Sequence, residues 1–123
     1  GGESAQSRRS RAASVEVAWE VRCAKTAWDD LDQVATYIAR DSPNYAGAFV
    51  RELLDAGRSL AQMAERGRVV PEWNKRSIRE LLIGNYRLIY QVSERMVHVV
   101  GIVHGARDLD ALWKREGRRP SQN

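Results

Sequence analysis

Five side chains in the second half of the chain carry the chemistry that metal-free RNA cleavage requires. Attack by a ribose 2′-hydroxyl needs a base, an acid for the leaving oxygen, and cations for the extra phosphoryl charge. Glu72 and His104 are the candidate bases, and the candidate cations are Arg79, Arg87 and Arg107. The residue types therefore make a nuclease site conceivable, provided that the fold brings them together.

Each of these residues also has a structural interpretation. Arg87 has two acidic residues, Glu72 and Glu80, with which it could simply pair. Glu72 follows Pro71 in an expected loop, where turn and ion-pair residues are common. His104 ends a strand pattern, which is typical of a histidine satisfied by its neighbours. The sequence leaves both interpretations open.

The first half of the chain predicts one strand followed by two helices. Residues 15–23 alternate between apolar and mostly polar side chains, which is the period of a strand. Apolar residues then recur at helical spacing over 27–38, and again over 46–64. Ser42 and Pro43 suit the start of the second helix, and Gly67 suits its C-terminal cap. The short link predicts an antiparallel helical hairpin. Four aromatic residues are expected in the core: Trp19, Trp28, Tyr86 and Tyr90.

The second half returns to strand patterns. Residues 68–70 form a short extended piece, and longer strands are expected over 77–83, 86–92 and 97–104, with a last helical turn over 108–113. The fold class is therefore α+β: an N-terminal strand, a helical hairpin, then an antiparallel β-meander. The hairpin can cover only one face of a four-stranded antiparallel sheet. The other face is expected to be open or half open, with Arg87 pointing to it, as a docking surface for a partner or an anionic substrate.

Composition indicates a globular domain without a membrane span. The chain has 123 residues, enough for one core, and 43% of them are hydrophobic. No apolar run approaches the roughly 20 residues that cross a bilayer. Residues 1–14 lack the apolar stretch of a signal peptide, and Cys23 is the only cysteine. We therefore expect a cytoplasmic protein.

The net charge of +4 comes from the ends of the sequence. Residues 1–14 carry three arginines against one glutamate, and residues 114–123 carry four basic residues against one glutamate. Both ends are predicted to be disordered tails. The domain between them, 15–113, has 13 basic and 14 acidic residues. Its charge is segregated, with an acidic stretch over 29–55 and a basic stretch over 66–107. A nearly neutral domain is poorly suited to binding the negatively charged backbone of RNA.

The order of elements and four local patterns resemble the RelE/ParE toxin superfamily. The patterns lie within residues 27–50, 67–72, 79–90 and 100–109. Together with the first strand, they span the expected domain, 15–113. The first holds Asp41-Ser42-Pro43 and the second Gly67-Arg68-Val69-Val70-Pro71-Glu72. The third holds Tyr86-Arg87-Leu88-Ile89-Tyr90, and the fourth runs from Val100-Gly101-Ile102-Val103-His104 to Asp108-Leu109.

The resemblance implies a toxin that is neutralised by an antitoxin encoded in the same operon. RelE-like members cleave mRNA on the ribosome, and ParE-like members inhibit DNA gyrase. Glu72 and Arg87 lie near positions that match catalytic residues of some RelE-like nucleases, and His104 lies near their C-terminal catalytic group. The candidates for contacting the target are Arg68, Arg79 and Arg107. The sequence does not indicate which residues bind the antitoxin.

Two absences favour the ParE-like activity. RelE-like nucleases usually have a lysine-rich patch and often a tyrosine near the C-terminus, whereas this domain has only Lys25 and Lys75, and no tyrosine follows Tyr90. We therefore expect a gyrase inhibitor, with an mRNA endonuclease as the alternative. A non-toxic relative or an unrelated adaptor domain is a third interpretation. No cofactor or metal is expected, because two histidines and one cysteine give no ligand spacing and no glycine-rich phosphate loop is present.

Overall fold

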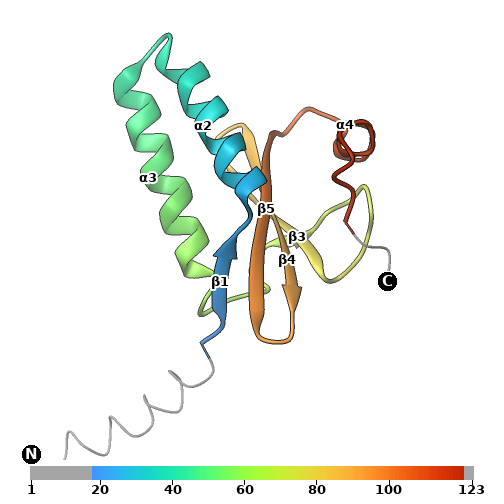
Figure 1. Cartoon of the computed structure of the whole chain (residues 1–123). Coiled ribbons are helices and arrows are strands. Elements are labelled where there is room, and N and C mark those ends of the chain that lie inside the picture. The colour runs from blue at the N-terminus through green and yellow to red at the C-terminus, as the bar shows by residue number, and fades with distance from the viewer. Residues whose placement is uncertain (1–17, 121–123) are drawn as a thin grey trace, which may run out of the picture.

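A computed structural model describes residues 18–120, which form one mixed five-stranded sheet and three helices (Figure 1). The strands lie in the order β1-β5-β4-β3-β2. The elements in chain order are β1 (Glu20–Cys23), α2 (Lys25–Ala39), α3 (Pro43–Ser59), β2 (Arg68–Val69), β3 (Ile78–Ile83), β4 (Tyr86–Ser93), β5 (Met96–His104) and α4 (Leu109–Glu116). The α+β class, with a strand, a helical hairpin and a meander in that order, is confirmed.

The direction of β1 differs from the prediction of an antiparallel sheet. β1 pairs in parallel with β5, with Glu20 opposite Met96 and Cys23 opposite Val99. The meander β3-β4-β5 is antiparallel as expected, and so is the short pair of β2 and β3. A strand pattern shows which face is buried but not which strand becomes the neighbour, and here the first strand pairs with the last. Part of the expected strand 15–23 lies outside the described residues.

The helical hairpin packs on one face of the sheet and forms the larger core. Ser42 caps α3 by accepting a hydrogen bond from the Tyr45 amide at 3.1 Å, and Pro43 is the first helical residue, as predicted. Phe49 and Leu53 of α3 are buried against Leu88 and Tyr90 of β4 in this core. Because the alternating residues of β4 point to opposite faces, this side of the strand is apolar throughout.

The end of α3 differs from the predicted end. The helix stops at Ser59, with Leu60 as its C-cap; of the apolar residues predicted beyond it, Leu60 and Ala64 are buried, whereas Met63 is 54% exposed. Gly67 is therefore not a helix cap. A Cβ at this position would lie 2.6 Å from both the Glu80 carbonyl oxygen and the Tyr90 hydroxyl. The Gly67 amide donates to that hydroxyl at 2.9 Å, so close backbone approach explains the glycine.

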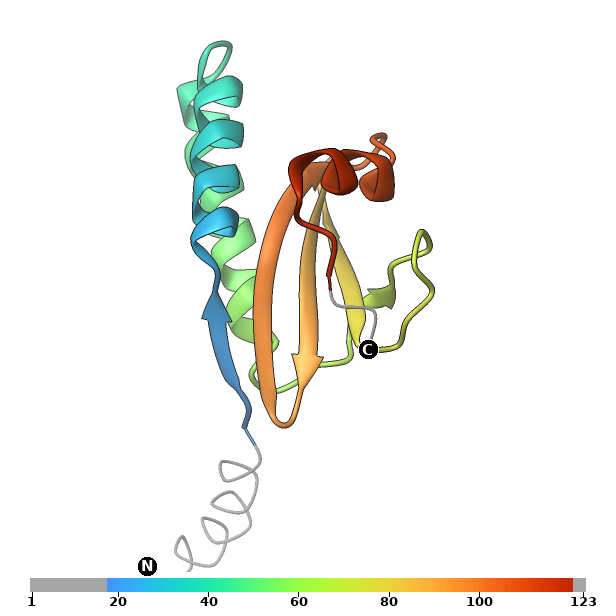
Figure 2. The same ribbon diagram turned by 45° about the vertical axis from the view of Figure 1, so that its right-hand side comes forward.

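The second face of the sheet is covered at one end and is therefore half open, one of the two predicted states, but Arg87 is buried there and does not reach an open surface. There α4 packs against β4 and β5 on the side away from the hairpin (Figure 2). The smaller core beneath it contains Val70, Ile78, Ile89, Val103, Leu109 and Trp113. Asp108 caps the helix by accepting from the Ala111 amide. The helical turn expected over 108–113 is thus a full helix that closes a second core.

The prediction of a disordered tail over 114–123 is wrong for residues 114–120, and residues 121–123 lie outside the described residues. Lys114, Arg115 and Glu116 complete α4, and Arg118 returns to the sheet. The Arg118 guanidinium donates to both carboxylate oxygens of Asp30 on α2, at 2.8 and 3.2 Å. It also lies 4.6 Å from the centre of the Trp113 ring. Specific pairing therefore outweighs the polar composition of this segment. The predicted tail 1–14 lies outside the described residues.

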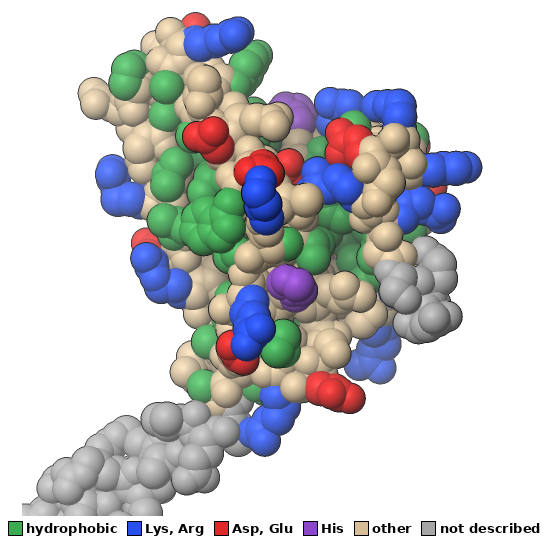
Figure 3. Space-filling model, in the orientation of Figure 1, with side chains coloured by type: hydrophobic (Ala, Val, Ile, Leu, Met, Phe, Trp, Pro, Cys, Tyr) green, Lys and Arg blue, Asp and Glu red, His purple; other side chains and the backbone are tan. Residues whose placement is uncertain are grey.

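Trp28 was expected in the core, but half of its surface is exposed, at 50%. It belongs to a strip of hydrophobic side chains that reaches the surface between α2, α3 and β1 (Figure 3). Trp19 packs against the hairpin core, Tyr90 is fully buried, and Tyr86 is partly buried there, in line with the prediction for these three residues.

We expect Gly67→Ala to lower the free energy of unfolding by roughly 1–3 kcal/mol, because the new methyl group would meet backbone and ring atoms that cannot move aside. Denaturant unfolding followed by circular dichroism measures this. Gly57→Ala in α3 is the matched control, because a Cβ there has no atom within 4 Å, and it should be neutral or stabilising. Equal unfolding midpoints for the two variants would contradict the close-approach explanation.

Candidate functional site

The site is built around a buried arginine on β4. Arg87 points to the α4 side of the sheet, as the alternation of β4 predicts, but it is only 4% exposed. Its nearest buried partner is Glu80 of β3, whose side chain is fully buried. Burying charges without partners is costly, so their presence in a small domain requires a complete set of hydrogen bonds.

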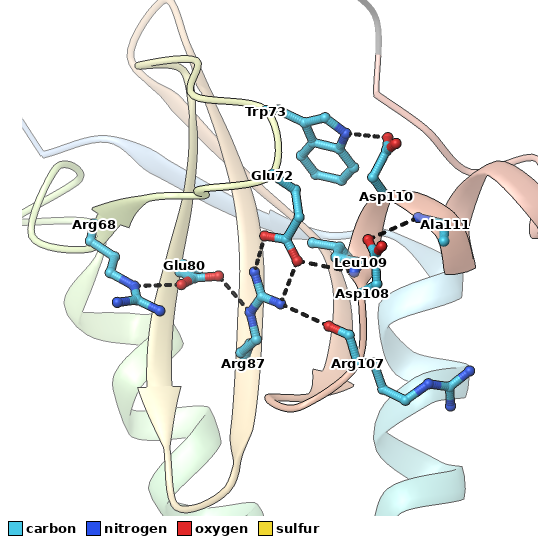
Figure 4. Close-up of polar contacts among 10 residues, drawn as sticks. All are labelled: Arg68, Glu72, Trp73, Glu80, Arg87, Arg107, Asp108, Leu109, Asp110 and Ala111. Atoms are coloured by element: carbon cyan, nitrogen blue, oxygen red, sulfur yellow. Dashed lines mark hydrogen bonds and ion pairs between the residues drawn. The ribbon is translucent and has the colours of Figure 1, made fainter.

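Two carboxylates accept hydrogen bonds from the guanidinium group of Arg87 (Figure 4). Its Nε donates to Glu80 at 2.7 Å, and its two Nη atoms donate to the two oxygens of Glu72 at 2.6 and 2.9 Å. A longer contact of 3.4 Å joins Nη1 to the Arg107 carbonyl oxygen. On its other side, Glu80 accepts from Arg68, the residue directly opposite it on β2. We call Arg68, Glu72, Glu80 and Arg87 the Arg87 network.

Glu72 connects this network to the start of α4. One of its oxygens also accepts from the amide of Leu109, the first residue of the helix, at 3.0 Å. A carboxylate at a helix N-terminus is favoured by the helix dipole. Next to it, the Trp73 indole donates to Asp110 of α4 at 2.6 Å. The loop between β2 and β3 is thereby held to both the sheet and α4.

The same contacts set the acidity of Glu72. The hydrogen bonds from Arg87, assisted by the Leu109 amide, lower the pKa of Glu72 from 4.5 to about 2, against the opposing effect of burial. The pKa of Arg87 is raised, chiefly by its hydrogen bonds to Glu72. Both groups are therefore charged at neutral pH, and the Glu72 carboxylate is a weaker base than an ordinary glutamate.

His104 lies on the other face of the sheet. In the β4–β5 register Arg87 is opposite Val103, whereas His104 is opposite Tyr86, whose side chain points toward the hairpin. The His104 ring packs edge-on against the Tyr86 ring, with centroids 5.3 Å apart, and its Nδ1 accepts from the Ala106 amide. The structure thus brings Glu72 and Arg87 together but separates His104 from them. The catalytic roles remain predictions.

The three arginines proposed to contact the target also lie on different faces of the sheet. Arg68 and Arg107 line a shallow depression together with Glu72 and Arg87. Arg79 points to the hairpin side, where it donates to the carbonyl oxygens of Glu65 and Gly67 before β2 and of Arg76 before β3. Arg79 therefore has a structural role that the sequence did not indicate. In Figure 4 the Arg107 side chain points away from the Arg87 network.

Sequence reasoning missed Asp30 and Arg118. The Asp30 carboxylate accepts a hydrogen bond from the Ile102 amide of β5 as well as from Arg118. Since β1 ends at Cys23, this amide lies beyond the last residue of β5 that β1 pairs. No sequence signal identifies such a pair, because its members are 88 residues apart. Among the described residues, no group of three or more potential ligands could hold a metal ion, and no helix is long and apolar enough to cross a membrane.

Comparison with known proteins identifies the family. A family model described as the ParE toxin of the type II toxin–antitoxin system parDE matches residues 21–109. Toxin RelE2 of Caulobacter vibrioides is 36% identical over 93 residues, which are 75% of this chain and 97% of that toxin. The chain therefore belongs to the ParE toxin family of type II toxin–antitoxin systems, within the RelE/ParE superfamily that the sequence patterns resemble.

A solved structure shares the fold. A chain from the chromosomal ParDE toxin–antitoxin system of P. aeruginosa aligns with a TM-score of 0.59 and 19% identity, covering 72% of this chain and 97% of that one. A chain of the RelBE2 toxin–antitoxin complex of Mycobacterium tuberculosis aligns with a TM-score of 0.47 and 22% identity, covering 71% and 98%.

We expect Arg87→Ala to destabilise the protein by roughly 3–5 kcal/mol, because it leaves the buried Glu80 carboxylate without its buried partner. Arg107→Ala removes an exposed arginine from the same depression and should change stability by less than about 0.5 kcal/mol. Urea unfolding at neutral pH measures both. If the two variants unfolded at the same urea concentration, the structural role of Arg87 would be wrong.

Glu72 should make the stability depend on pH in the acid range. Its pKa is lowered on folding, so its contribution is complete above about pH 4.5 and is lost as the pH falls toward 2. We therefore expect the difference in unfolding free energy between the wild type and Glu72→Gln to shrink over this interval. Unfolding curves recorded at steps of pH test this, and a constant difference would contradict it.

Proposed function

We propose that this toxin acts by binding DNA gyrase as a stoichiometric inhibitor, without chemistry of its own. The observation that carries the proposal is the separation of the candidate catalytic groups onto two faces of the sheet. His104 packs on Tyr86 on the hairpin side, and Arg87 is buried with Glu72 on the α4 side. Side chains on opposite faces of a sheet do not converge on one RNA phosphate.

The state of Glu72 and Arg87 supports the same proposal. A general base works best with a pKa near the operating pH, and the pKa of Glu72 is about 2. The nitrogens of Arg87 that would contact a developing phosphoryl charge already donate to Glu72 and Glu80. Recruiting Arg87 to a substrate would require breaking a buried ion pair, which costs several kcal/mol.

Target binding would then use the exposed arginines around the depression. Arg68 keeps 60% of its side chain exposed although it pairs with Glu80, and Arg107 is exposed. Basic side chains also gather over α4 in Figure 3. Such a cluster suits an acidic patch on a large protein target, and its effect should weaken with salt. Arg79 is not part of this proposed surface, because it is bound to carbonyl oxygens on the other side.

A supercoiling assay tests the proposal. Purified toxin should inhibit gyrase in a saturable way, and the double change of Arg68 and Arg107 to Ala should weaken inhibition roughly tenfold. Arg51→Ala, which removes an exposed arginine on α3, is the matched control and should inhibit like the wild type. Unchanged supercoiling at micromolar toxin, in cells whose growth is still arrested, would reject gyrase as the target.

One observation favours the alternative, a ribosome-dependent mRNA endonuclease. The relative that covers three quarters of this chain is named Toxin RelE2, and the depression brings Glu72 and Arg87 together beside exposed arginines. This alternative requires new, codon-phased 5′ ends on translated mRNA after induction. Their presence with wild-type toxin and their absence with Arg107→Ala, which preserves the buried network, would replace gyrase inhibition as the proposed function.

The proposal includes an antitoxin from the same operon and action in the cytoplasm, where gyrase and ribosomes are found. The solved relatives come from toxin–antitoxin systems, and the family is defined by that pairing. We therefore propose that the product of the adjacent gene binds this toxin, and that coexpression restores growth. Failure of that product to bind the wild-type toxin would reject this part of the proposal.

A further inference from the structure

The last helix is held to the rest of the domain at both of its ends. At its start, the Leu109 amide donates to Glu72 of the Arg87 network at 3.0 Å. At its end, Gly117 adopts a left-handed conformation, with a φ of 70°, and the chain turns back along the sheet (Figure 2). This return places Arg118 at the edge of β5, next to α2.

Arg118 and Asp30 form an ion pair that joins the end of α4 to α2. The two Nη atoms of Arg118 donate to the two carboxylate oxygens of Asp30, at 2.8 and 3.2 Å. Nη2 also donates to the Val100 carbonyl oxygen at 3.0 Å, and Asp30 accepts from the Ile102 amide at 2.9 Å. Glu116 accepts from Nη1 at 3.2 Å. The Arg118 and Asp30 side chains are only 18% and 15% exposed, so water screens them less than an ordinary surface pair. We call this pair the C-terminal clasp.

The clasp lies beside the largest side chain of the smaller core under α4. Trp113 is 1% exposed, and the Arg118 guanidinium lies 4.6 Å from the centre of its ring. The ring packs on Gly101 of β5, where a Cβ would clash with the ring and lie 2.8 Å from Nη2 of Arg118. The position of α4 on the sheet is therefore fixed by the fit of one ring and by the clasp next to it.

The helix that the clasp holds has a basic outer surface. Lys114 and Arg115 in its last turn are exposed, and so is Arg107 in the loop that leads into it. A helix moves largely as one body, so a shift of its C-terminal end would move these charges relative to Arg68 at the depression. Attraction to a charged protein surface depends on how the charges are placed as well as on their number.

We propose that Asp30 and Arg118 are positioning residues for target binding. They hold α4 so that its basic residues and those of the depression form one surface for an acidic protein target. This inference rests on the proposed function, because it concerns the target surface proposed there. Asp30 lies on α2, is mostly buried and acts on this surface only through Arg118 and α4.

Asp30→Asn separates positioning from charge. Asparagine keeps an oxygen that can accept from the Ile102 amide, but it loses the ion pair with Arg118. The variant is more positive than the wild type, so attraction to an acidic target alone would strengthen inhibition of gyrase. The positioning role predicts the opposite, and inhibition in the supercoiling assay should weaken roughly fivefold. Arg118→Ala should weaken it at least as much. The double variant should be no weaker than Arg118→Ala, because both changes break the same contact.

Two control variants address stability and charge. Val97→Ala leaves a cavity in the hairpin core at the other end of β5, so it lowers stability without touching the clasp and should inhibit like the wild type. Arg119→Ala removes the neighbouring arginine, which pairs with Asp110, and should weaken inhibition less than Arg118→Ala does.

Hydrogen exchange reports on the helix itself. In Asp30→Asn, the amides of the last turn of α4 should exchange at least about tenfold faster than in the wild type, because this end of the helix has lost its tie to α2. The amides of β4, which lie within the sheet, should exchange at the wild-type rate.

The outcomes separate this inference from the function on which it rests. If Asp30→Asn inhibited gyrase as well as the wild type or better, the positioning role would be wrong although the action on gyrase stood. Weaker inhibition with unchanged exchange in α4 would also contradict it, since the helix would not have moved. An equal loss in Val97→Ala would assign the effect to stability and overturn the inference. No inhibition by the wild type would instead reject the proposed function.

Discussion

The structure depends on a buried arginine that is neutralised from two sides. Arg87 lies on the central strand of the sheet, where the bidentate pair with Glu72 and the bond to Glu80 compensate its lost hydration. Because Glu72 also accepts from the Leu109 amide, this pairing holds the β2–β3 loop to the sheet and positions the start of α4. The second core under α4 therefore forms around a charged network, and removing one member would affect strand, loop and helix together.

Periodicity predicted most of the elements, since it reports which face of each element is buried. Periodicity does not predict which residues far apart in the sequence pair with one another. The parallel pairing of β1 with β5 and the Asp30–Arg118 bond both join residues from opposite ends of the chain, and no local pattern encodes them. For the site, alternation along β4 correctly placed Arg87 on the face away from the hairpin. The face of His104 depended on the register shift between β4 and β5, because an extra residue of β5 after Val99 reverses the alternation of the strand, and no local pattern reveals such a bulge.

The two faces of the sheet differ in physical character. On the α4 side, charged groups are paired with one another, and Arg68 and Arg107 remain exposed at a shallow depression. On the hairpin side, an apolar groove lies between α2, α3 and β1. A polar, shallow surface suits a reversible encounter with a large target. The C-terminal clasp joins the two sides at the edge of β5, so the hairpin helps to fix the helix that borders the proposed target surface.

The central claim is that the Arg87 network supports the fold and takes no part in chemistry. Buried ion pairs can often be replaced by apolar residues of similar size without loss of the fold. The most direct measurement is growth arrest by a variant that carries Glu72→Gln, Glu80→Met and Arg87→Met together, with its soluble level matched to the wild type. Our account predicts that the folded variant still arrests growth. Normal growth in the presence of the folded, soluble variant would contradict it.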